Sequence, residues 1–496
     1  MSGGPLATPS PRCYSLPTLA GLYLVHTFGC QMNAHDSDRM EEVLRASGWS
    51  RAESAEQADL IVLNTCSVRE KAEQKLRSEV GKLAPLKAKN PGLVLAVAGC
   101  VAQQEGEKLL ARVGHLDLLI GPDNIADLPA LAREQMDGAP PRAHTVFDLD
   151  APRFLAAAPR PGEAPVSAWV TTMKGCDERC SFCIVPYTRG PERYRPAEDI
   201  VAEIARWVLA GSREVTLLGQ TVDSYRDPSL PPPASDDPDE SQFPSLLRMI
   251  AERVPGLLRL RYTSPHPRHA TAALAQAHAE LDVLARHLHM PVQSGSDRIL
   301  KRMIRRYTRA EYTERVRRLL AARPGMTLST DVIVGFPGET DADFEATLDV
   351  IRDVGFVGLF GFKYSPRPFT PALKLADDVP EEVKSERLAR LFEVAESQTR
   401  AHLATLLGTR QTVLVEGASK AQGKVSGRTE RNEIVHLDVP PGRLLIGAVV
   451  VAEITQAFKH SLHGTLDPAT IAALPALGEA SVTRPERRRR SLTMVP

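Results

Sequence analysis

Three cysteines stand within eight residues in the segment KGCDERCSFCIVPYTRG, namely Cys176, Cys180 and Cys183. Three thiolates at this spacing can bind one metal centre from a single loop. Zinc normally takes a fourth ligand from a second Cys or His pair, and the sequence has no such pair nearby. A 4Fe–4S cluster held by three cysteines instead leaves one iron open to a small molecule. We therefore predict that Cys176, Cys180 and Cys183 are the ligands of a catalytic 4Fe–4S cluster.

Three further cysteines, Cys30, Cys66 and Cys100, each follow a short apolar run. Taken alone, Cys100 reads as a buried small hydrophobe, because unpaired cysteine is among the most buried residue types. If the three runs are parallel strands of one sheet, however, their carboxyl ends lie side by side at the edge where such sheets bind ligands. We therefore predict that these three thiols bind a second cluster, and that Gly29 and Gly99 allow its close approach.

The elements that must position the second set lie in residues 20–136, where apolar runs alternate with helix-favouring segments. This alternation predicts a Rossmann-like α/β domain whose parallel sheet is covered on both faces. Helices are expected over 36–48, with Asp36 at the start, and over 67–89 and 101–114. Residues 137–161 are rich in Pro and Ala and are expected to be a linker, and residues 1–19 a disordered lead-in.

A second alternating region, residues 162–405, predicts a partial βα barrel. The cluster loop follows the apolar run AWVTTM, so we expect it at the carboxyl mouth of the barrel, where such folds place active sites. Short strands separated by glycines over 408–470 predict a small antiparallel β-barrel, a fold that commonly binds nucleic acid. Residues 471–496 form a basic tail.

Several polar residues also fall at predicted strand ends of the barrel. Such side chains suit a nucleotide ligand, but each of them also suits the cap of a helix. The turn in STDVIVGFPGET is equally consistent with a cradle for adenosine and with a well-capped loop. The candidate cofactor contacts are Gln220, Ser294, Gly335 and Glu339. His266, between two prolines, is expected to be exposed and to have no catalytic role.

Composition describes an ordinary globular protein with 61 basic and 61 acidic residues. Between Arg298 and Arg323 there are ten Lys or Arg against two acids; such runs are most often solvated, but with the basic tail they favour an RNA partner. No apolar run approaches the roughly 20 residues that span a bilayer, and no secretory signal is present, so we expect a cytoplasmic protein without a membrane partner. Seven cysteines do not suggest a disulfide scaffold, and Cys13 is expected to have no role.

With both cysteine sets identified, the chain resembles the radical S-adenosylmethionine methylthiotransferases over nearly its whole length. Phe182 before the last cysteine of the loop adds to this resemblance, and GRTERNEIV and VVVAEITQAFKHSLHG look like segments of the RNA-binding TRAM domain. The resemblance implies two 4Fe–4S clusters and S-adenosylmethionine as cofactors. It further implies that one S-adenosylmethionine methylates sulfur at the auxiliary cluster, and that a second is cleaved to a deoxyadenosyl radical.

The segments TFGCQMNAHDSDRM, LNTCSVREKAEQK and IVPYTRG resemble the branch that methylthiolates C2 of N6-isopentenyladenosine at position 37 of tRNA. This resemblance implies that tRNA as substrate, and we expect a low-potential electron donor and a monomeric chain. One departure is Tyr194, where the branch usually has Ser. Three alternatives stay open: a methylthiotransferase acting on a ribosomal protein, one acting on threonylcarbamoyl-adenosine in tRNA, and a non-catalytic iron–sulfur protein that binds RNA.

Overall fold

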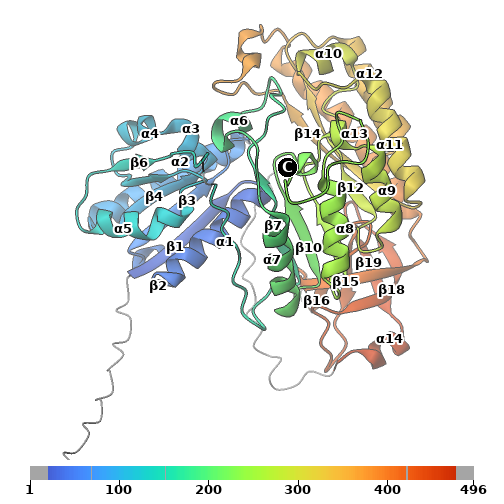
Figure 1. Ribbon diagram of the computed structural model, residues 1–496, viewed down its shortest axis with the longest axis horizontal. Helices are drawn as coiled ribbons and strands as arrows, with labels where there is room; N and C mark the ends of the chain where they lie inside the picture. Colours follow the sequence, from blue (N-terminus) through green and yellow to red (C-terminus); the bar gives the residue numbers. More distant parts are fainter. Residues whose placement is uncertain (1–20, 69, 151, 421–422, 476–496) are drawn as a thin grey trace, which may run out of the picture.

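The computed structural model describes residues 21–68, 70–150, 152–420 and 423–475. It contains three units in chain order: an α/β unit, a partial βα barrel beside it and a small β-barrel (Figure 1). The expected lead-in 1–19, Cys13 and most of the basic tail lie outside the described residues. None of the helices in the described ranges combines the length and apolarity needed to cross a membrane.

The first unit is a six-stranded parallel sheet with the order β2-β1-β3-β4-β5-β6. Helices cover both faces and form two separate hydrophobic cores, which confirms the Rossmann-like prediction. The strands are β1 (Gly21–Phe28), β2 (Trp49–Arg51), β3 (Leu60–Thr65), β4 (Val94–Gly99), β5 (Leu118–Ile120) and β6 (Arg142–His144). The helices are α1 (Gln31–Ala46), α2 (Glu70–Lys89), α3 (Cys100–Glu105), α4 (Glu107–Arg112) and α5 (Leu128–Met136).

Three local expectations in this unit are wrong. Helix α1 begins at Gln31 rather than at Asp36, because Cys30 occupies the cap position and Asp36 is buried inside the helix in an ion pair. The helix expected over 101–114 is broken into α3 and α4 at Gly106, whose φ of 53° does not continue a helix. The expected linker contains β6, which pairs with β5 through backbone hydrogen bonds. The Pro- and Ala-rich composition of the linker did not predict this strand.

The second unit contains two three-stranded parallel sheets, β7-β10-β11 and β12-β13-β14. A parallel bridge between Leu260 and Leu284 links them, and one hydrophobic core lies beneath both, so the unit is the expected partial barrel. Its strands are β7 (Ser167–Thr171), β10 (Glu214–Leu218), β11 (Arg259–Tyr262), β12 (His287–His289), β13 (Thr327–Val334) and β14 (Gly358–Lys363). The helices are α7 (Ala197–Leu209), α8 (Phe243–Arg253), α9 (Ala272–Glu280), α10 (Asp297–Arg302), α11 (Arg309–Ala322), α12 (Asp341–Val354) and α13 (Glu381–Ala404).

The cluster loop leaves the barrel just after β7. It is held at its base by the antiparallel pair of β8 (Met173–Lys174) and β9 (Arg193–Tyr194), and it ends in the short helix α6 (Val185–Arg189). Gly175 opens the loop with a φ of 83°, and a Cβ there would overlap the carbonyl of Pro191. Helix α6 contacts α3 of the first unit, so the loop lies where the two units meet (Figure 1).

The third unit is a closed five-stranded barrel in the order β15-β16-β17-β19-β18, which confirms the expected fold. Its strands are β15 (Arg410–Ala418), β16 (Lys424–Thr429), β17 (Ile434–Asp438), β18 (Val449–Ala457) and β19 (Leu462–Leu466), followed by α14 (Pro468–Ala473). The turn between β16 and β17 docks on the amino ends of the second unit's strands. There Arg261 donates to the carbonyl of Thr429 at 3.0 Å, and Thr327 donates to that of Arg431 at 3.2 Å.

Candidate iron–sulfur active site

The dispersed cysteines meet at one edge of the first sheet. Cys30, Cys66 and Cys100 directly follow β1, β3 and β4, which are neighbours in the sheet. The neighbouring thiol of Cys66 lowers the pKa of Cys30, and the same interaction raises the pKa of Cys66. Burial raises the pKa of Cys100, and the neighbouring Arg189 opposes this effect. The convergence expected from strand order is therefore observed, and their role as cluster ligands stays a prediction.

The two glycines before these cysteines serve the packing of the strand ends. A Cβ on Gly29 would lie 2.5 Å from the Cβ of Cys66, and one on Gly99 would lie 2.8 Å from the carbonyl oxygen of Thr65. Both glycines have positive φ values. Their absent side chains thus leave room for the adjacent strand, and the expectation that they also allow the close approach of a cluster stays a prediction.

The three cysteines of the loop are packed against the barrel mouth. Cys176 and Cys180 are buried and Cys183 is half-buried. The Oγ1 of Thr221 lies 3.0 Å from the Sγ of Cys176, and Arg305 donates a 3.3 Å hydrogen bond to the Sγ of Cys180. Burial, with a smaller effect from the charge of Cys180, raises the pKa of Cys183 to about 12. Burial also raises the pKa of Cys176, and a bound cation would favour the thiolate form of both residues.

The two cysteine sets face each other across the junction of the first and second units. The charge of Cys100 is close enough to contribute to the raised pKa of Cys183. Arg189, the last residue of α6, is buried and donates from Nε to the Sγ of Cys100 at 3.3 Å and from Nη2 to Asp36 at 2.6 Å. Although burial opposes ionisation, the guanidinium lowers the pKa of Asp36 to about 2.

Further ion pairs hold the same two units together. Asp123 of the first unit pairs with Lys174 at 3.2 Å and with Arg193, and Arg39 on α1 lies 3.9 Å from Glu203 on α7. A pocket opens beside these pairs, lined by residues from α1, from the segment around Asp123 and from β7 and β8. The arrangement presents charged side chains of both signs near the two thiol sets.

Both thiol sets have the donors that an iron–sulfur cluster requires. Thiolates are the usual protein ligands of such clusters, and a buried arginine beside each set offsets the negative charge of a thiolate-bound cluster. Within the described ranges, no group of three or more His, Cys, Asp or Glu side chains is placed to hold a single metal ion. That these residues suit iron–sulfur clusters therefore follows from the chemistry of their donor atoms, with three thiols available for each cluster.

The four candidate cofactor contacts are engaged within the protein. The Oε1 of Gln220 accepts from the Gly175 amide at 2.6 Å, and the Oγ of Ser294 accepts from the Ser296 amide at 3.2 Å. The Gly335 amide donates to Glu339 at 2.7 Å, and Arg387 donates to the same carboxylate at 2.8 Å. These bonds shape the loops at the mouth, and contact with S-adenosylmethionine stays a prediction.

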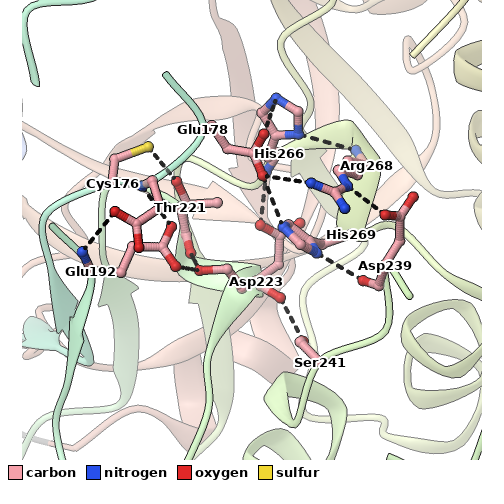
Figure 2. Close-up of polar contacts among 12 residues, drawn as sticks. Cys176, Glu178, Glu192, Thr221, Asp223, Asp239, Ser241, His266, Arg268 and His269 are labelled. Atoms are coloured by element: carbon pink, nitrogen blue, oxygen red, sulfur yellow. Dashed lines mark hydrogen bonds and ion pairs between the residues drawn. The ribbon is translucent and has the colours of Figure 1, made fainter. Parts of the chain in front are cut away.

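A buried polar network under the cluster loop was missed (Figure 2). Glu178, between the first two loop cysteines, lies 3.3 Å from the Nε2 of His269, and Asp223 accepts from the His266 amide at 2.8 Å. His266 is buried, so the expectation that it is exposed is wrong; the bond to Asp223 holds it inside. The Oε2 of Glu178, the Oδ2 of Asp223 and the Nε2 of His266 have no hydrogen-bond partner among the described residues. These three atoms are free to form hydrogen bonds with a water molecule or a ligand.

Part of the basic run expected to favour RNA is used inside the protein. Arg305 bonds Cys180, Arg315 pairs with Asp239 at 2.9 Å, and Arg323 is buried against backbone carbonyls. Local sequence could not reveal this, because each partner is far away in the chain. Arg298, Lys301, Arg306 and Arg317 remain exposed, and Arg298 also pairs with Asp343.

Comparison with known proteins agrees with each unit. Residues 22–121 match the uncharacterized protein family UPF0004, residues 170–351 the radical SAM superfamily and residues 404–466 the TRAM domain. A solved structure of the radical S-adenosylmethionine methyltransferase TsrM from Kitasatospora setae, with cobalamin and a [4Fe-4S] cluster bound, has a TM-score of 0.50 at 15% identity. The match covers 81% of each chain and shows a shared fold.

Two curated relatives are far more similar. The tRNA-2-methylthio-N(6)-dimethylallyladenosine synthase of Sorangium cellulosum (strain So ce56) is 62% identical over 94% of this chain and 97% of its own length. The synthase of the same name from Bordetella petrii is 46% identical over 88% of this chain and 90% of its own.

The fold and the two thiol sets thus define a radical S-adenosylmethionine enzyme of the methylthiotransferase class with a C-terminal TRAM domain. The cofactors of this class are S-adenosylmethionine and two 4Fe–4S clusters. More narrowly, the chain belongs to the family of tRNA-2-methylthio-N(6)-dimethylallyladenosine synthases.

Proposed function

We propose that this chain inserts a methylthio group at C2 of N6-isopentenyladenosine at position 37 of tRNA. The observation that carries the proposal is the meeting of two thiol triplets at the junction of the α/β unit and the barrel mouth. An unactivated aromatic C–H bond requires a radical, and the inserted sulfur requires a carrier, so two adjacent cofactor sites suit this reaction. The relatives from Sorangium cellulosum and Bordetella petrii, 62% and 46% identical to this chain, carry the name of the corresponding synthase.

The six thiols have separate tasks in this proposal. Cys176, Cys180 and Cys183 hold the cluster at the barrel mouth, and the dispersed triplet Cys30, Cys66 and Cys100 holds the auxiliary cluster. When bound, the clusters and S-adenosylmethionine supply the radical, the methyl group and the sulfur. The protein positions them: Thr221 contacts Cys176, and Gln220 fixes the first turn of the loop through the amide of Gly175.

Recognition of tRNA is assigned to the TRAM barrel and to exposed basic residues on the second unit. Lys301, Arg306 and Arg317 can contact phosphates, and such contacts position an RNA without reading its sequence. Docking of the β16–β17 turn on the barrel sets the distance between the RNA-binding unit and the active site. The proposal also includes a low-potential electron donor, a monomeric chain and a cytoplasmic location.

The test is anaerobic reconstitution with iron, sulfide, S-adenosylmethionine and a low-potential reductant, followed by mass analysis of nucleosides from isopentenylated tRNA. We expect a methylthiolated product from this tRNA and none from the same tRNA without the isopentenyl group. Parallel reactions use tRNA with threonylcarbamoyl-adenosine and purified ribosomal proteins. A product only in one of those reactions would replace the proposed substrate, and no product or S-adenosylmethionine cleavage in any would favour a non-catalytic protein.

A further inference from the structure

Arg189 reaches from the barrel unit into the auxiliary thiol site of the first unit. Its side chain is buried, its Nε donates to the Sγ of Cys100 at 3.3 Å and its Nη2 donates to Asp36 at 2.6 Å. The third nitrogen, Nη1, has no hydrogen-bond partner in the described part of the chain, although it is buried. The guanidinium therefore has a spare donor beside a cluster ligand.

A buried guanidinium with a free N–H is costly unless a further acceptor is present in the working protein. Asp36 balances the charge and fixes the orientation of the guanidinium plane. Helix α6 begins two residues after Cys183, so the same short segment joins the radical loop to the auxiliary site. The guanidinium thus joins the segment that follows Cys183 to the thiol of Cys100.

We propose that Arg189 is a positioning residue that holds the anionic sulfur ligand of the auxiliary site. The ligand is a hydrosulfide or methylthiolate at the iron that three cysteines leave open, and it accepts a charge-assisted hydrogen bond from the guanidinium. This inference rests on the proposed function, in which the auxiliary site carries the sulfur. A guanidinium suits the task because its charge persists at any working pH and its N–H groups have a fixed geometry.

The alternative role of Arg189 is to dock the two units through Asp36. Arg39 provides a matched control, since it is also a buried arginine at this junction and lies on the same helix as Asp36. It pairs with Glu42 at 2.9 Å and approaches Glu203 of the second unit at 3.9 Å. Its Nε and Nη1 are also buried without a hydrogen-bond partner among the described residues, but it makes no hydrogen bond to a cysteine there. Its replacement therefore tests the loss of a buried arginine at the junction without the loss of a contact to a thiol.

The experiment uses the full-length chain with Cys176, Cys180 and Cys183 replaced by Ala, so that only the auxiliary site is loaded. Sodium hydrosulfide is titrated into the reduced protein, and binding is followed by the electron paramagnetic resonance spectrum of the cluster. We expect about four irons per chain in every variant. Loss of a hydrogen bond from a charged donor predicts hydrosulfide binding weaker by about tenfold or more in Arg189→Gln. The hydrosulfide affinity of Arg189→Lys, which keeps the charge, should lie between those of Arg189→Gln and the parent.

Arg39→Gln is expected to bind hydrosulfide as the parent does. The proposal is overturned if Arg189→Gln binds like the parent, or if Arg39→Gln loses as much affinity. It is also overturned if both Arg189 variants fail to load iron while Arg39→Gln loads normally, because Arg189 would then be required by the cluster itself. Since the titration contains no tRNA, its result is independent of whether isopentenylated tRNA is the substrate.

Discussion

The guanidinium of Arg305 donates a 3.3 Å hydrogen bond to the Sγ of Cys180 at the barrel mouth. It also donates to the carbonyl of Pro291 at 3.2 Å and lies 5.1 Å from the centre of the Tyr307 ring. The contact has the same N–H to sulfur form as that of Arg189 with Cys100. Each thiol set thus has one cysteine that accepts from a buried arginine of the barrel unit.

Replacement of Arg305 tests this contact at the radical site. A positive charge that donates to a cluster ligand favours the reduced cluster, so Arg305→Gln should make the reduction potential more negative. Deoxyadenosine formation should fall by about tenfold, in line with one charged hydrogen bond. Spectroscopic redox titration and chromatography of deoxyadenosine measure the two effects. Arg302→Gln, on the neighbouring α10, is the control; an unchanged potential in Arg305→Gln would contradict the assignment.

Two cysteine variants separate the two sites. Cys183→Ala should abolish deoxyadenosine formation while the auxiliary cluster is retained, because it removes a ligand of the loop only. Cys100→Ala should leave deoxyadenosine formation intact and stop methylthio insertion. Iron analysis should give about four irons per chain for each variant against about eight for the unmodified chain. Loss of both activities in Cys100→Ala would show that the two sites do not act separately.

Asp223 makes stability depend on pH. Burial raises the pKa of Asp223 to about 7, from an ordinary value near 4 in the unfolded chain. Below about pH 4 the carboxyl is protonated in both the folded and the unfolded chain, and its full contribution to the free energy of unfolding is present. This contribution is lost as the pH rises towards 7, because the unfolded chain ionises freely while the buried carboxyl resists ionisation.

Asp223→Asn cannot ionise, and its remaining amide oxygen can still accept from the His266 amide. We expect the difference in unfolding temperature, variant minus unmodified chain, to be more positive at pH 8 than at pH 5. Asp282→Asn, at a nearly fully exposed carboxylate, should show no such trend. A difference for Asp223→Asn that stays constant with pH would show that the carboxyl does not titrate in this range.

Glu214 links the barrel unit to the TRAM unit. Its buried carboxylate pairs with Arg259 at 3.1 Å and Arg261 at 2.9 Å, and both arginines donate to carbonyls of the TRAM unit. Glu214→Gln leaves two buried guanidinium groups without their counter-charge, which should cost about 3–5 kcal/mol of unfolding free energy. Denaturant unfolding and proteolysis between the units measure the change. Glu198→Gln, which breaks an exposed pair with Arg253, should have no measurable effect.

Much of the architecture could be predicted from sequence. The apolar runs before Cys30, Cys66 and Cys100 are local patterns, and parallel strands must align their carboxyl ends, so the meeting of the three thiols followed from strand order. The three loop cysteines could be predicted as cluster ligands from their spacing alone. Strand β6 was missed because its three residues, Arg142–His144, contain no apolar run and are recruited by pairing with β5.

The surroundings of the thiols were decided by tertiary structure. Arg189 and Cys100 are 89 residues apart in the sequence, and Arg305 and Cys180 are 125 residues apart. No local sequence pattern could therefore predict either contact. His266 reads as an exposed histidine between prolines, yet Asp223 holds it inside the mouth. The sequence by itself determined which thiols meet, because strand order and spacing are written along the chain. Only the folded molecule determined which charges are buried beside them, because that depends on residues brought together from separate units.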